Sequence, residues 1–243
     1  LEVAFKQLES FSYSVSHDLR APLRHIQGYG DILMRHAGEQ LDEESLRCLN
    51  IMISASGEMS KLIDDLLSYS RTGGAELSRR DISLNELVDE VRAVLAPSLK
   101  GRNIHCSIGD LPVVSGEPTL IGIVLTNLLD NALKYSRNNT DTNIEVSCQG
   151  EENGFAIIRV KDNGAGFDMR YAAKLFGVFQ RLHSHDEFDG NGIGLATVRQ
   201  IIDRHGGRTW AEGEVGKGAA FYFTIESSDS GYWEKRRRNG SDV

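Results

Sequence analysis

One short stretch of the chain combines a histidine with groups that would make it a nucleophile. His17 is followed directly by Asp18, and Arg20 and Pro22 complete the cluster within six residues. A neighbouring carboxylate can orient one imidazole nitrogen and accept its proton, which leaves the other nitrogen free to attack. Arg20 can help to screen an incoming anion. For the histidine considered alone, a solvated residue without a chemical role remains the alternative.

The residues around His17 follow a seven-residue pattern. Apolar side chains recur at alternating steps of four and three over Leu1–Leu33, which predicts a helix of about 33 residues with one apolar seam. On this pattern Val15 and Leu19 face a bundle core and His17 points outward, which argues against a histidine satisfied within a core. Pro22 interrupts the seam. Proline inside a helix costs about 3 kcal/mol, so we expect the kink to be useful.

A second helix is predicted after a short break at residues 36–40. Apolar residues repeat from Leu46 to Leu67, and Asp42, Glu43 and Glu44 lie in the first turn, where carboxylates favour the helix dipole. Two long helices joined by a turn form a hairpin. Because each apolar stripe is wider than one partner can cover, we expect two hairpins to form a four-helix bundle in a homodimer.

Another set of polar residues lies on a strongly apolar predicted helix, residues 117–136. Asn127, Asn131 and Lys134 are four and three residues apart and therefore share one face. Amide oxygens suit a Mg²⁺ shell, and a lysine ammonium suits phosphate. A polar helix edge with only structural hydrogen bonds is the alternative.

Glycines gather in the second half of the chain, where 13 of the 25 fall between residues 150 and 218. Asp162 ends a predicted strand and is followed by Gly164 and Gly166, so a carboxylate there can accept the amino hydrogens of a base, although an ordinary turn is also possible. The stretch Gly190-Asn-Gly192-Ile-Gly194-Leu195 precedes a predicted helix at 193–205, where backbone N–H groups can bind phosphates.

These segments together resemble one family. The stretch Ser16-His-Asp-Leu-Arg-Ala-Pro-Leu23 resembles the phosphoacceptor box of sensor histidine kinases, and the later segments resemble the boxes of that family's ATP-binding domain in the same order. The resemblance covers about residues 11–221. The short stretch Gln180–Asp189 and the histidine box look like the phytochrome-type and PAS-linked members.

The resemblance implies a role for each segment. His17 would accept the phosphoryl group from ATP, with Asp18 as base or orienting group, and pass it to an aspartate of a separate response regulator. Asn131 would bind Mg²⁺, and Asp162 would read adenine. Nucleotide-binding residues would be Asn127, Asn131, Lys134, Tyr135, Asp162, Gly164, Gly166, Arg181, Gly190, Gly192, Gly194 and Leu195, with Arg181 reaching the terminal phosphate. Lys174–Leu182 resembles the phenylalanine box, and Gly216–Phe221 the last glycine box.

One position departs from the family pattern. Many members have threonine or asparagine four residues after the histidine, where the side chain positions water for dephosphorylating the regulator. Ala21 stands there in this chain and has no polar side-chain atom. We therefore hypothesise strong kinase and weak phosphatase activity.

The fold class expected is an α-helical hairpin followed by an α/β sandwich of the Bergerat type. Residues 1–72 would form the dimerisation and phosphotransfer hairpin, 73–77 a hinge at Thr72-Gly-Gly-Ala75, 78–227 the ATP-binding domain, and 228–243 a polar, disordered tail. Strands and helices segregate in the third range, which predicts a mixed sheet covered by helices on one face. Expected strands lie at 82–84, 104–108, 144–148, 155–161, 208–213 and 219–225, and one further helix, with apolar residues at 87–95, stops at Pro97.

Composition excludes several other classes. The 243-residue chain has a net charge of −8, which argues against a nucleic-acid-coating protein, so no nucleic-acid partner is expected. Three separated cysteines lack metal-ligand spacing and favour a reducing compartment, and no apolar run is long enough to span a bilayer. We expect the cytoplasmic portion of a possibly membrane-anchored protein, with a sensor domain upstream.

Three rival functions share parts of this pattern. An ATPase of the same superfamily acting as a clamp needs no outward histidine on a helical hairpin. A degenerate kinase serving as a dimeric scaffold would have lost Asp162, Asn131 or a glycine. A serine/threonine kinase of the anti-sigma type lacks the hairpin.

Overall fold

The computed structural model describes residues 2–74, 77–96, 102–183, 187–188 and 190–228, and the side chains of 2–15 and 17 lie outside that description. The expected tail falls almost entirely on 229–243, which are outside the described residues. The chain divides into two compact units, Leu1–Ala75 and Glu76–Val243.

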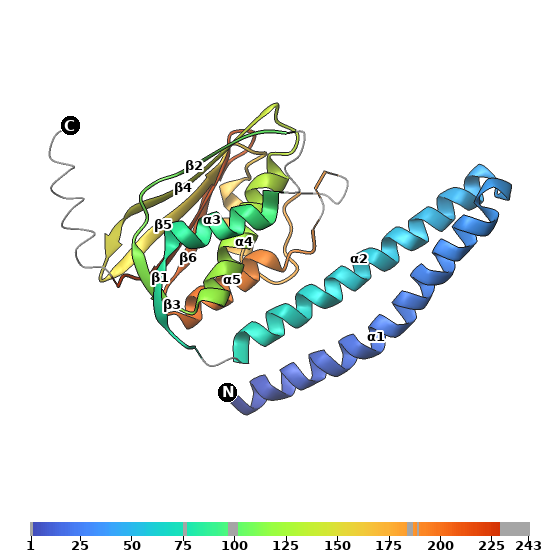
Figure 1. Ribbon diagram of the computed structural model, residues 1–243, viewed down its shortest axis with the longest axis horizontal. Coiled ribbons are helices and arrows are strands. Elements are labelled where there is room, and N and C mark those ends of the chain that lie inside the picture. The colour runs from blue at the N-terminus through green and yellow to red at the C-terminus, as the bar shows by residue number, and fades with distance from the viewer. Residues whose placement is uncertain (1, 75–76, 97–101, 184–186, 189, 229–243) are drawn as a thin grey trace. The chain divides into compact units, whose positions relative to one another are not determined.

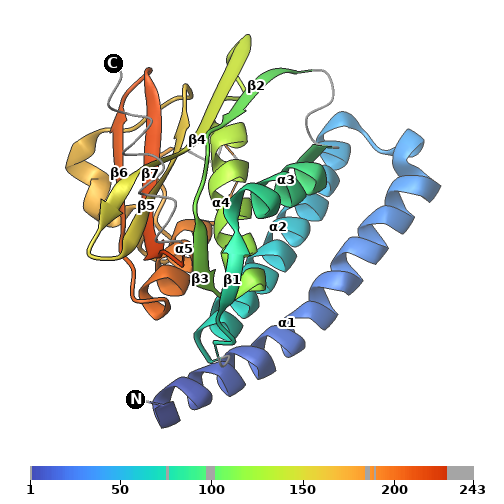
Figure 2. The ribbon, with the colours of Figure 1, turned by 60° about the vertical axis from the view of Figure 1, so that its left-hand side comes forward.

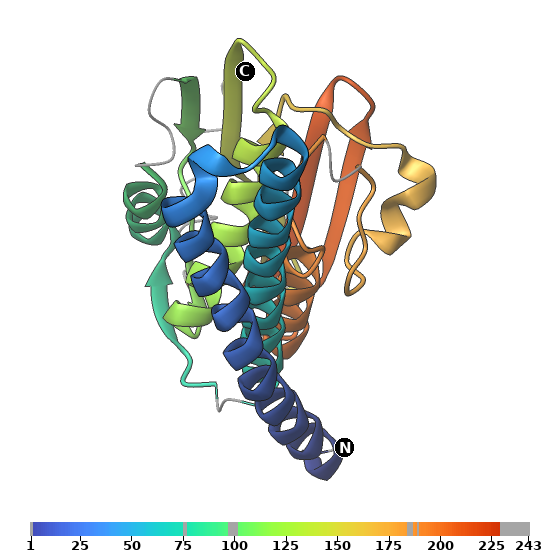
Figure 3. The same ribbon diagram turned by 90° about the vertical axis from the view of Figure 1, so that its right-hand side faces the viewer.

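The first unit is a hairpin of two long helices, α1 (Glu2–Ala37) and α2 (Glu43–Gly74), joined through a 3₁₀ turn at Gly38–Gln40. The helices lie side by side and antiparallel (Figure 3). Pro22 lies inside α1, which continues on both sides of it. The expected hinge is wrong in part, because Thr72, Gly73 and Gly74 are helical and belong to the end of α2.

The face of α1 that packs against α2 differs from the expected seam. Ser16, Leu23 and Gly30, seven residues apart, are buried on it, and a Cβ on Gly30 would lie 2.6 Å from Cγ1 of Ile53 in α2. The buried residues of α2 also recur at seven-residue steps, as Leu49, Ser56, Ile63 and Ser70. Small side chains let the two backbones approach closely, so the larger apolar residues point elsewhere.

Those larger apolar residues remain exposed in the single chain. Side chains of the expected seam that the structure describes have exposed fractions from 42% at Leu19 to 72% at Tyr29. The seven-residue period is shared by two adjacent faces of the helix, and the sequence does not say which one faces α2. The exposed set comprises Leu19, Ile26, Tyr29, Ile32, Leu33, Ile51, Met52 and Met59.

The second unit is a layer of helices on one face of a mixed sheet (Figures 1 and 2). Its strand order is β2-β4-β5-β7-β6, with β2 parallel to β4 and the other neighbours antiparallel, and β1 and β3 form a separate antiparallel pair. The expected hairpin and α/β sandwich are confirmed. Elements are β1 (Arg80–Ser83), α3 (Leu84–Leu95), β2 (Asn103–Ile108), β3 (Val113–Gly116), α4 (Pro118–Tyr135), β4 (Asp141–Glu152), β5 (Phe155–Asp162), a 3₁₀ helix (Met169–Lys174), α5 (Gly194–Arg204), β6 (Thr209–Glu214) and β7 (Gly218–Glu226).

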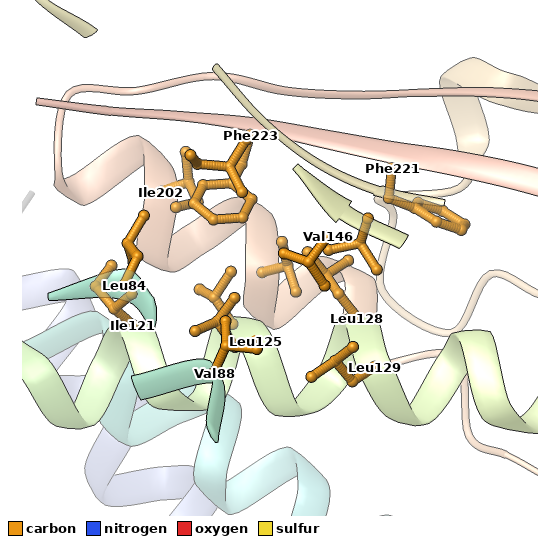
Figure 4. Close-up of a cluster of buried hydrophobic side chains, with 14 of the residues drawn as sticks. Leu84, Val88, Ile121, Leu125, Leu128, Leu129, Val146, Ile202, Phe221 and Phe223 are labelled. Atoms are coloured by element: carbon orange, nitrogen blue, oxygen red, sulfur yellow. The ribbon is translucent and has the colours of Figure 1, made fainter. Parts of the chain in front are cut away.

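Helix α4 is the centre of the hydrophobic core (Figure 4). Glu117 caps its N-terminus by accepting the Leu120 N–H, and Pro118 takes the first helical position, where a missing N–H costs nothing. Leu125 and Leu128 are almost fully buried against α3, α5 and the sheet, and each such side chain contributes about 2 kcal/mol. Packing in the core therefore fixes the position of α4 and of its polar face, which carries Asn127, Asn131 and Lys134.

A buried histidine joins α5 to the start of α4. Nε2 of His205 accepts the Glu117 N–H at 3.1 Å, and Nδ1 lies 2.7 Å from the Ile201 carbonyl oxygen. Because a carbonyl can only accept, the proton sits on Nδ1 of a neutral ring. Burial lowers the pKa of His205, which keeps the ring neutral at physiological pH.

Candidate functional site

The histidine box lies on one continuous helix. The side chains of Val15 and His17 are outside the described part of α1, so the outward direction of His17 stays a prediction. On either side of it, Ser16 is buried and Asp18 is exposed. Arg20, expected to help screen an anion, forms an ion pair with Asp64 of α2.

The two asparagines on the polar face of α4 differ in their hydrogen bonds to the described part of the protein. Asn127 donates from Nδ2 to the Ile123 carbonyl at 2.8 Å. Among the described residues the half-buried Asn131 amide has no hydrogen-bond partner. The Asn131 amide is therefore open to water or to a ligand, whereas the Asn127 amide nitrogen is already used within the helix.

Tyr135 and Lys134 follow on the last turn of α4. The Lys134 ammonium lies 4.3 Å from the centre of the Tyr135 ring, within range of a cation–π contact. A Cβ on Gly190 would lie 2.8 Å from Lys134 Nζ. The glycine-rich stretch after the Gln180–Asp189 segment therefore comes within contact distance of the lysine expected to meet phosphate.

Asp162 is a buried carboxylate at the end of β5. Its exposed fraction is 3%, and Oδ1 accepts the Gly164 N–H at 2.8 Å. Burial raises its pKa from 3.8 to about 6, against the opposite effect of backbone N–H donors at Gly164 and Ala219. A carboxylate whose pKa is raised strongly by burial is typical of a functional site.

We predict an unusual pH response from Asp162. The folded state binds a proton between pH 3.8 and about 6 that the unfolded state does not, so wild-type stability falls as pH rises through this window. The difference in pKa corresponds to about 3 kcal/mol. Asp162→Asn should remove this loss, so its free energy of unfolding relative to wild type should increase between pH 4.5 and 7.5.

Urea denaturation of both proteins at the two pH values measures that difference. Taking the variant minus the wild type cancels other titrating groups such as His205. Equal shifts in the two proteins would show that Asp162 does not titrate above its ordinary range. The variant should also bind ADP more weakly, since an amide offers one acceptor oxygen where the carboxylate offers two.

The glycines after Asp162 bring protein backbone together. Gly166 has φ +63°, and a Cβ there would lie 2.0 Å from the Glu214 carbonyl oxygen; a Cβ on Gly164 would lie 2.6 Å from that of Tyr135. Gly218, expected only as part of a closing hairpin, approaches the Asp162 carbonyl in the same way. The loop carrying Asp162 is therefore fastened between α4 and the β6–β7 turn.

The glycine stretch from Gly190 to Gly194 leads into α5, whose N-terminus has no side-chain cap. Ile193 stands at the N-cap and makes no capping hydrogen bond, so the first N–H groups of the helix are available to an anion. A Cβ on Gly194 would lie 2.6 Å from Asn127 Oδ1, and one on Gly192 2.7 Å from the Gln180 carbonyl. Gly194 and Leu195 in this way lie next to the asparagine face of α4.

The phenylalanine box is divided between core and surface. Phe176 is buried, whereas Phe179 is 55% exposed with φ +61°, a left-handed conformation that costs a non-glycine residue about 1 kcal/mol or more. Phe179 therefore lies at the surface, whereas Phe176 belongs to the core. Arg181 donates to the Phe188 carbonyl at 2.6 Å, and its role at the terminal phosphate stays a prediction.

Sequence reasoning missed two residues beside this site. His183 and Phe188 belong to the quoted stretch 180–189, but no role was expected for either. Their rings and that of Tyr135 lie within 5.0–5.3 Å of one another. Aromatic rings in an otherwise polar stretch next to a glycine box were the available signal.

The donor set fits Mg²⁺ held mainly by phosphate. No cluster of three His, Cys, Asp or Glu side chains suitable for a metal occurs among the described residues. Mg²⁺ is commonly bound through one or two protein ligands together with substrate phosphates, and the Asn131 amide, without a hydrogen-bond partner among the described residues, offers an oxygen of the kind that this requires. The part of the chain that the structure describes has no helix suited to crossing a membrane.

Two family models match the chain. Residues 7–75 match the phosphoacceptor domain of histidine kinase A, and residues 116–229 match the ATPase domain of histidine kinases, DNA gyrase B and HSP90. The two matches follow the order of the two structural units.

Similar proteins include larger sensory kinases. The chain is 36% identical over 228 residues to cyanobacterial phytochrome B of Nostoc sp. (strain PCC 7120), covering 93% of this chain and 30% of the relative. It is 38% identical over 229 residues to the methanogenesis regulatory histidine kinase FilI of Methanothrix harundinacea, covering 93% and 25%. The chain thus spans about a third or less of these relatives.

The fold is also similar to solved structures. A crystal structure of full-length ShkA in complex with AMPPNP superimposes with a TM-score of 0.64 and 24% identity, over 91% of this chain and 47% of that one. At that identity the likeness concerns the fold alone.

Proposed function

Since the chain belongs to the sensor histidine kinase family, we propose that it is a catalytic core that transfers the γ-phosphoryl group of ATP to His17 and then to an aspartate of a separate response regulator. The observation that carries this proposal is the buried carboxylate of Asp162 in a domain that also presents the Asn131 amide, which has no hydrogen-bond partner among the described residues, in the same chain as the histidine box. Labelled ATP provides the test: the chain should acquire acid-labile, alkali-stable label.

The nucleotide would lie between α4, the Asp162 loop and the start of α5. Asp162 would accept hydrogen bonds from the adenine amino group, and Tyr135 would lie beside the base. Lys134, Arg181 and the backbone N–H groups from Gly190 to Leu195 would meet the phosphates. Phosphoryl transfer depends mostly on positioning and charge neutralisation, which such donors supply.

Asn131, with Asn127 nearby, would hold Mg²⁺. When bound, the ion neutralises phosphate charge and orients the terminal group. The protein's own part is to keep the Asn131 amide free of other hydrogen bonds and half shielded from water, which follows from its place on the buried helix α4.

At the other end of the reaction, Asp18 would orient the imidazole of His17 and accept its proton. The attacking nitrogen must be unprotonated, so the proton on the other nitrogen must be stabilised as positive charge develops. Asp18 is exposed and adjacent in sequence, and Arg20 of the same helix is already paired with Asp64. The ion pair holds this guanidinium against Asp64 of α2.

The partners follow from the same proposal. The exposed apolar residues of α1 and α2 would be covered by a second copy, giving a four-helix bundle. A response regulator would accept the phosphoryl group, and a sensor domain would precede this region. A cytoplasmic location agrees with the need for ATP and a response regulator.

Ala21 leads to a prediction about the reverse reaction. It lies four residues after His17 on the same helix and carries no group that could orient water. We expect the wild type to dephosphorylate its regulator weakly, and Ala21→Thr to raise the rate by about tenfold or more, within the range for a positioned polar group.

The measurement is loss of label from an isolated phosphorylated receiver, with ADP absent. Ala21→Val is the matched control, since it adds the same bulk without a hydroxyl. A fast loss of label with the wild type, or equal rates for the threonine and valine variants, would contradict the role assigned to this position.

A further inference from the structure

We propose that His183 is a positioning residue that fixes the adenine end of the nucleotide site. This inference rests on the proposed function in that it takes Asp162 and Tyr135 to be the residues that meet the base. It adds a residue outside the phosphoacceptor and nucleotide boxes, and it assigns that residue to selection of the base.

The first observation is a hydrogen bond from the His183 side chain to the loop that carries Asp162. Nε2 lies 2.9 Å from the carbonyl oxygen of Gly166. Because a carbonyl can only accept, Nε2 carries the proton and donates it. His183 is only 23% exposed at its side chain, so this bond is partly shielded from water.

The second observation is a set of ring contacts with the end of α4. The His183 ring lies 5.3 Å from the centre of the Tyr135 ring and 5.2 Å from that of Phe188, and these two rings are 5.0 Å apart. Aromatic pairs at such distances contribute about 0.5–1.5 kcal/mol beyond the area they bury. Phe188 is 4% exposed, so the group is anchored in the domain.

The two partners of His183 are themselves joined. The Ala165 N–H donates to the Tyr135 carbonyl at 3.0 Å, and the Gly216 N–H donates to the Ala165 carbonyl at 2.7 Å. His183 therefore adds side-chain contacts to a loop whose backbone is already hydrogen-bonded to α4 and to the β6–β7 turn. A hydrogen bond on one side and a ring contact on the other hold Gly166 and Tyr135 at a fixed separation.

The segment that carries His183 is fastened at neighbouring points. Arg181 donates to the Phe188 carbonyl at 2.6 Å, Arg137 donates to the Glu187 carbonyl, and the Arg137 guanidinium lies 5.1 Å from the Phe188 ring centre. These contacts place His183 without help from a nucleotide. The histidine can thus organise the base pocket before the substrate enters it.

A consequence follows for base selection. Loss of His183 leaves the backbone hydrogen bond from Ala165 to Tyr135 in place but frees the Tyr135 ring and the Gly166 carbonyl from each other, so the base is held less well between them. The phosphate contacts proposed for Lys134 and the glycine stretch make no direct use of the His183 side chain, so they should change less than the contacts with the base. We therefore expect adenine nucleotides to lose affinity and guanine nucleotides, which present an oxygen where adenine presents its amino group, to change little.

The experiment measures binding of ADP and GDP by calorimetry to the full chain and to His183→Ala. ADP should bind about tenfold more weakly and GDP within twofold of wild type, so that the preference for adenine shrinks. His183→Gln keeps a donor without the ring and His183→Phe keeps the ring without the donor, so each should recover part of the loss. His36→Ala, at an exposed histidine in the last turn of α1 and in the other compact unit, should bind as wild type does.

In labelling assays the half-saturating ATP concentration should rise while the maximal rate stays within about twofold. ADP affinity within twofold of wild type, or an equal loss for ADP and GDP, would overturn the proposal. Failure of the proposed function gives a different result, since label could be absent while ADP binding still depends on His183.

A readout without nucleotide completes the test. Hydrogen exchange of the peptide spanning Asp162–Phe167 should be faster in His183→Ala than in wild type and unchanged in His36→Ala. Unchanged exchange in that peptide would overturn the proposal even if the wild-type chain bound no nucleotide.

Discussion

Replacing His17 with glutamine should abolish phosphoryl incorporation from labelled ATP, with residual label below about 1% of wild type. Glutamine has similar length but no nucleophilic ring nitrogen, so no phosphoramidate bond can form. Nucleotide binding should persist within twofold, because the residues assigned to ATP lie in the other compact unit. The variant therefore separates transfer from binding.

The chemical stability of the label identifies the residue type. A phosphohistidine is lost in acid and retained in alkali, whereas phosphoserine and phosphothreonine survive acid. His36→Gln, an exposed histidine in the last turn of α1, is the matched control and should label as wild type does. Acid-labile, alkali-stable label that persists in His17→Gln would refute the assignment and move the acceptor elsewhere.

The main elements could be predicted because their patterns are local. Helix α4 and strands β5 and β7 show strong apolar periodicity and match the expected ranges closely. Strand β3 (Val113–Gly116) was not expected, because its four residues are too short to show alternation and it forms only by pairing with β1. Its existence depends on a contact between distant segments.

The hairpin shows where a pattern is ambiguous. A seven-residue period places apolar residues on neighbouring faces, and only packing decides which face meets α2. Gly30 and Ser16 are on the packed face because small side chains allow close approach, whereas Leu19 and Tyr29 are left exposed. A rule that places the largest apolar residues against the nearest helix fails here.

The residues expected at the site could be named from the sequence, but the contacts between them could not. Motif order identified Asp162 and Asn131, yet the role of Gly218 beside the Asp162 carbonyl depends on the β5–β7 pairing. His183 was missed because its partners, Gly166 and Tyr135, are 17 and 48 residues away. Such contacts follow from tertiary structure and leave no periodic trace in the chain.

Replacing Asn131 with alanine should abolish nucleotide-dependent labelling of His17 while leaving the chain at least as stable as wild type. The amide has no hydrogen-bond partner among the described residues, so removing it breaks no bond within the protein. Alanine is also the better helix former by about 0.7 kcal/mol. Loss of Mg²⁺ positioning, by contrast, should lower the transfer rate by about 100-fold or more, since charge neutralisation at the phosphates dominates this chemistry.

Three measurements on Asn131→Ala distinguish these effects. Labelling reports transfer, urea denaturation reports the free energy of unfolding, and light scattering reports whether the dimer persists. Asn138→Ala, at an exposed asparagine just after α4, controls for loss of an amide in this region. The combination of lost labelling with retained stability is specific to a ligand residue, because a structural asparagine would lose both together. Unchanged labelling would remove Asn131 from the metal role, and Asn127, whose amide nitrogen is already bonded to Ile123, would then be the remaining candidate on that face.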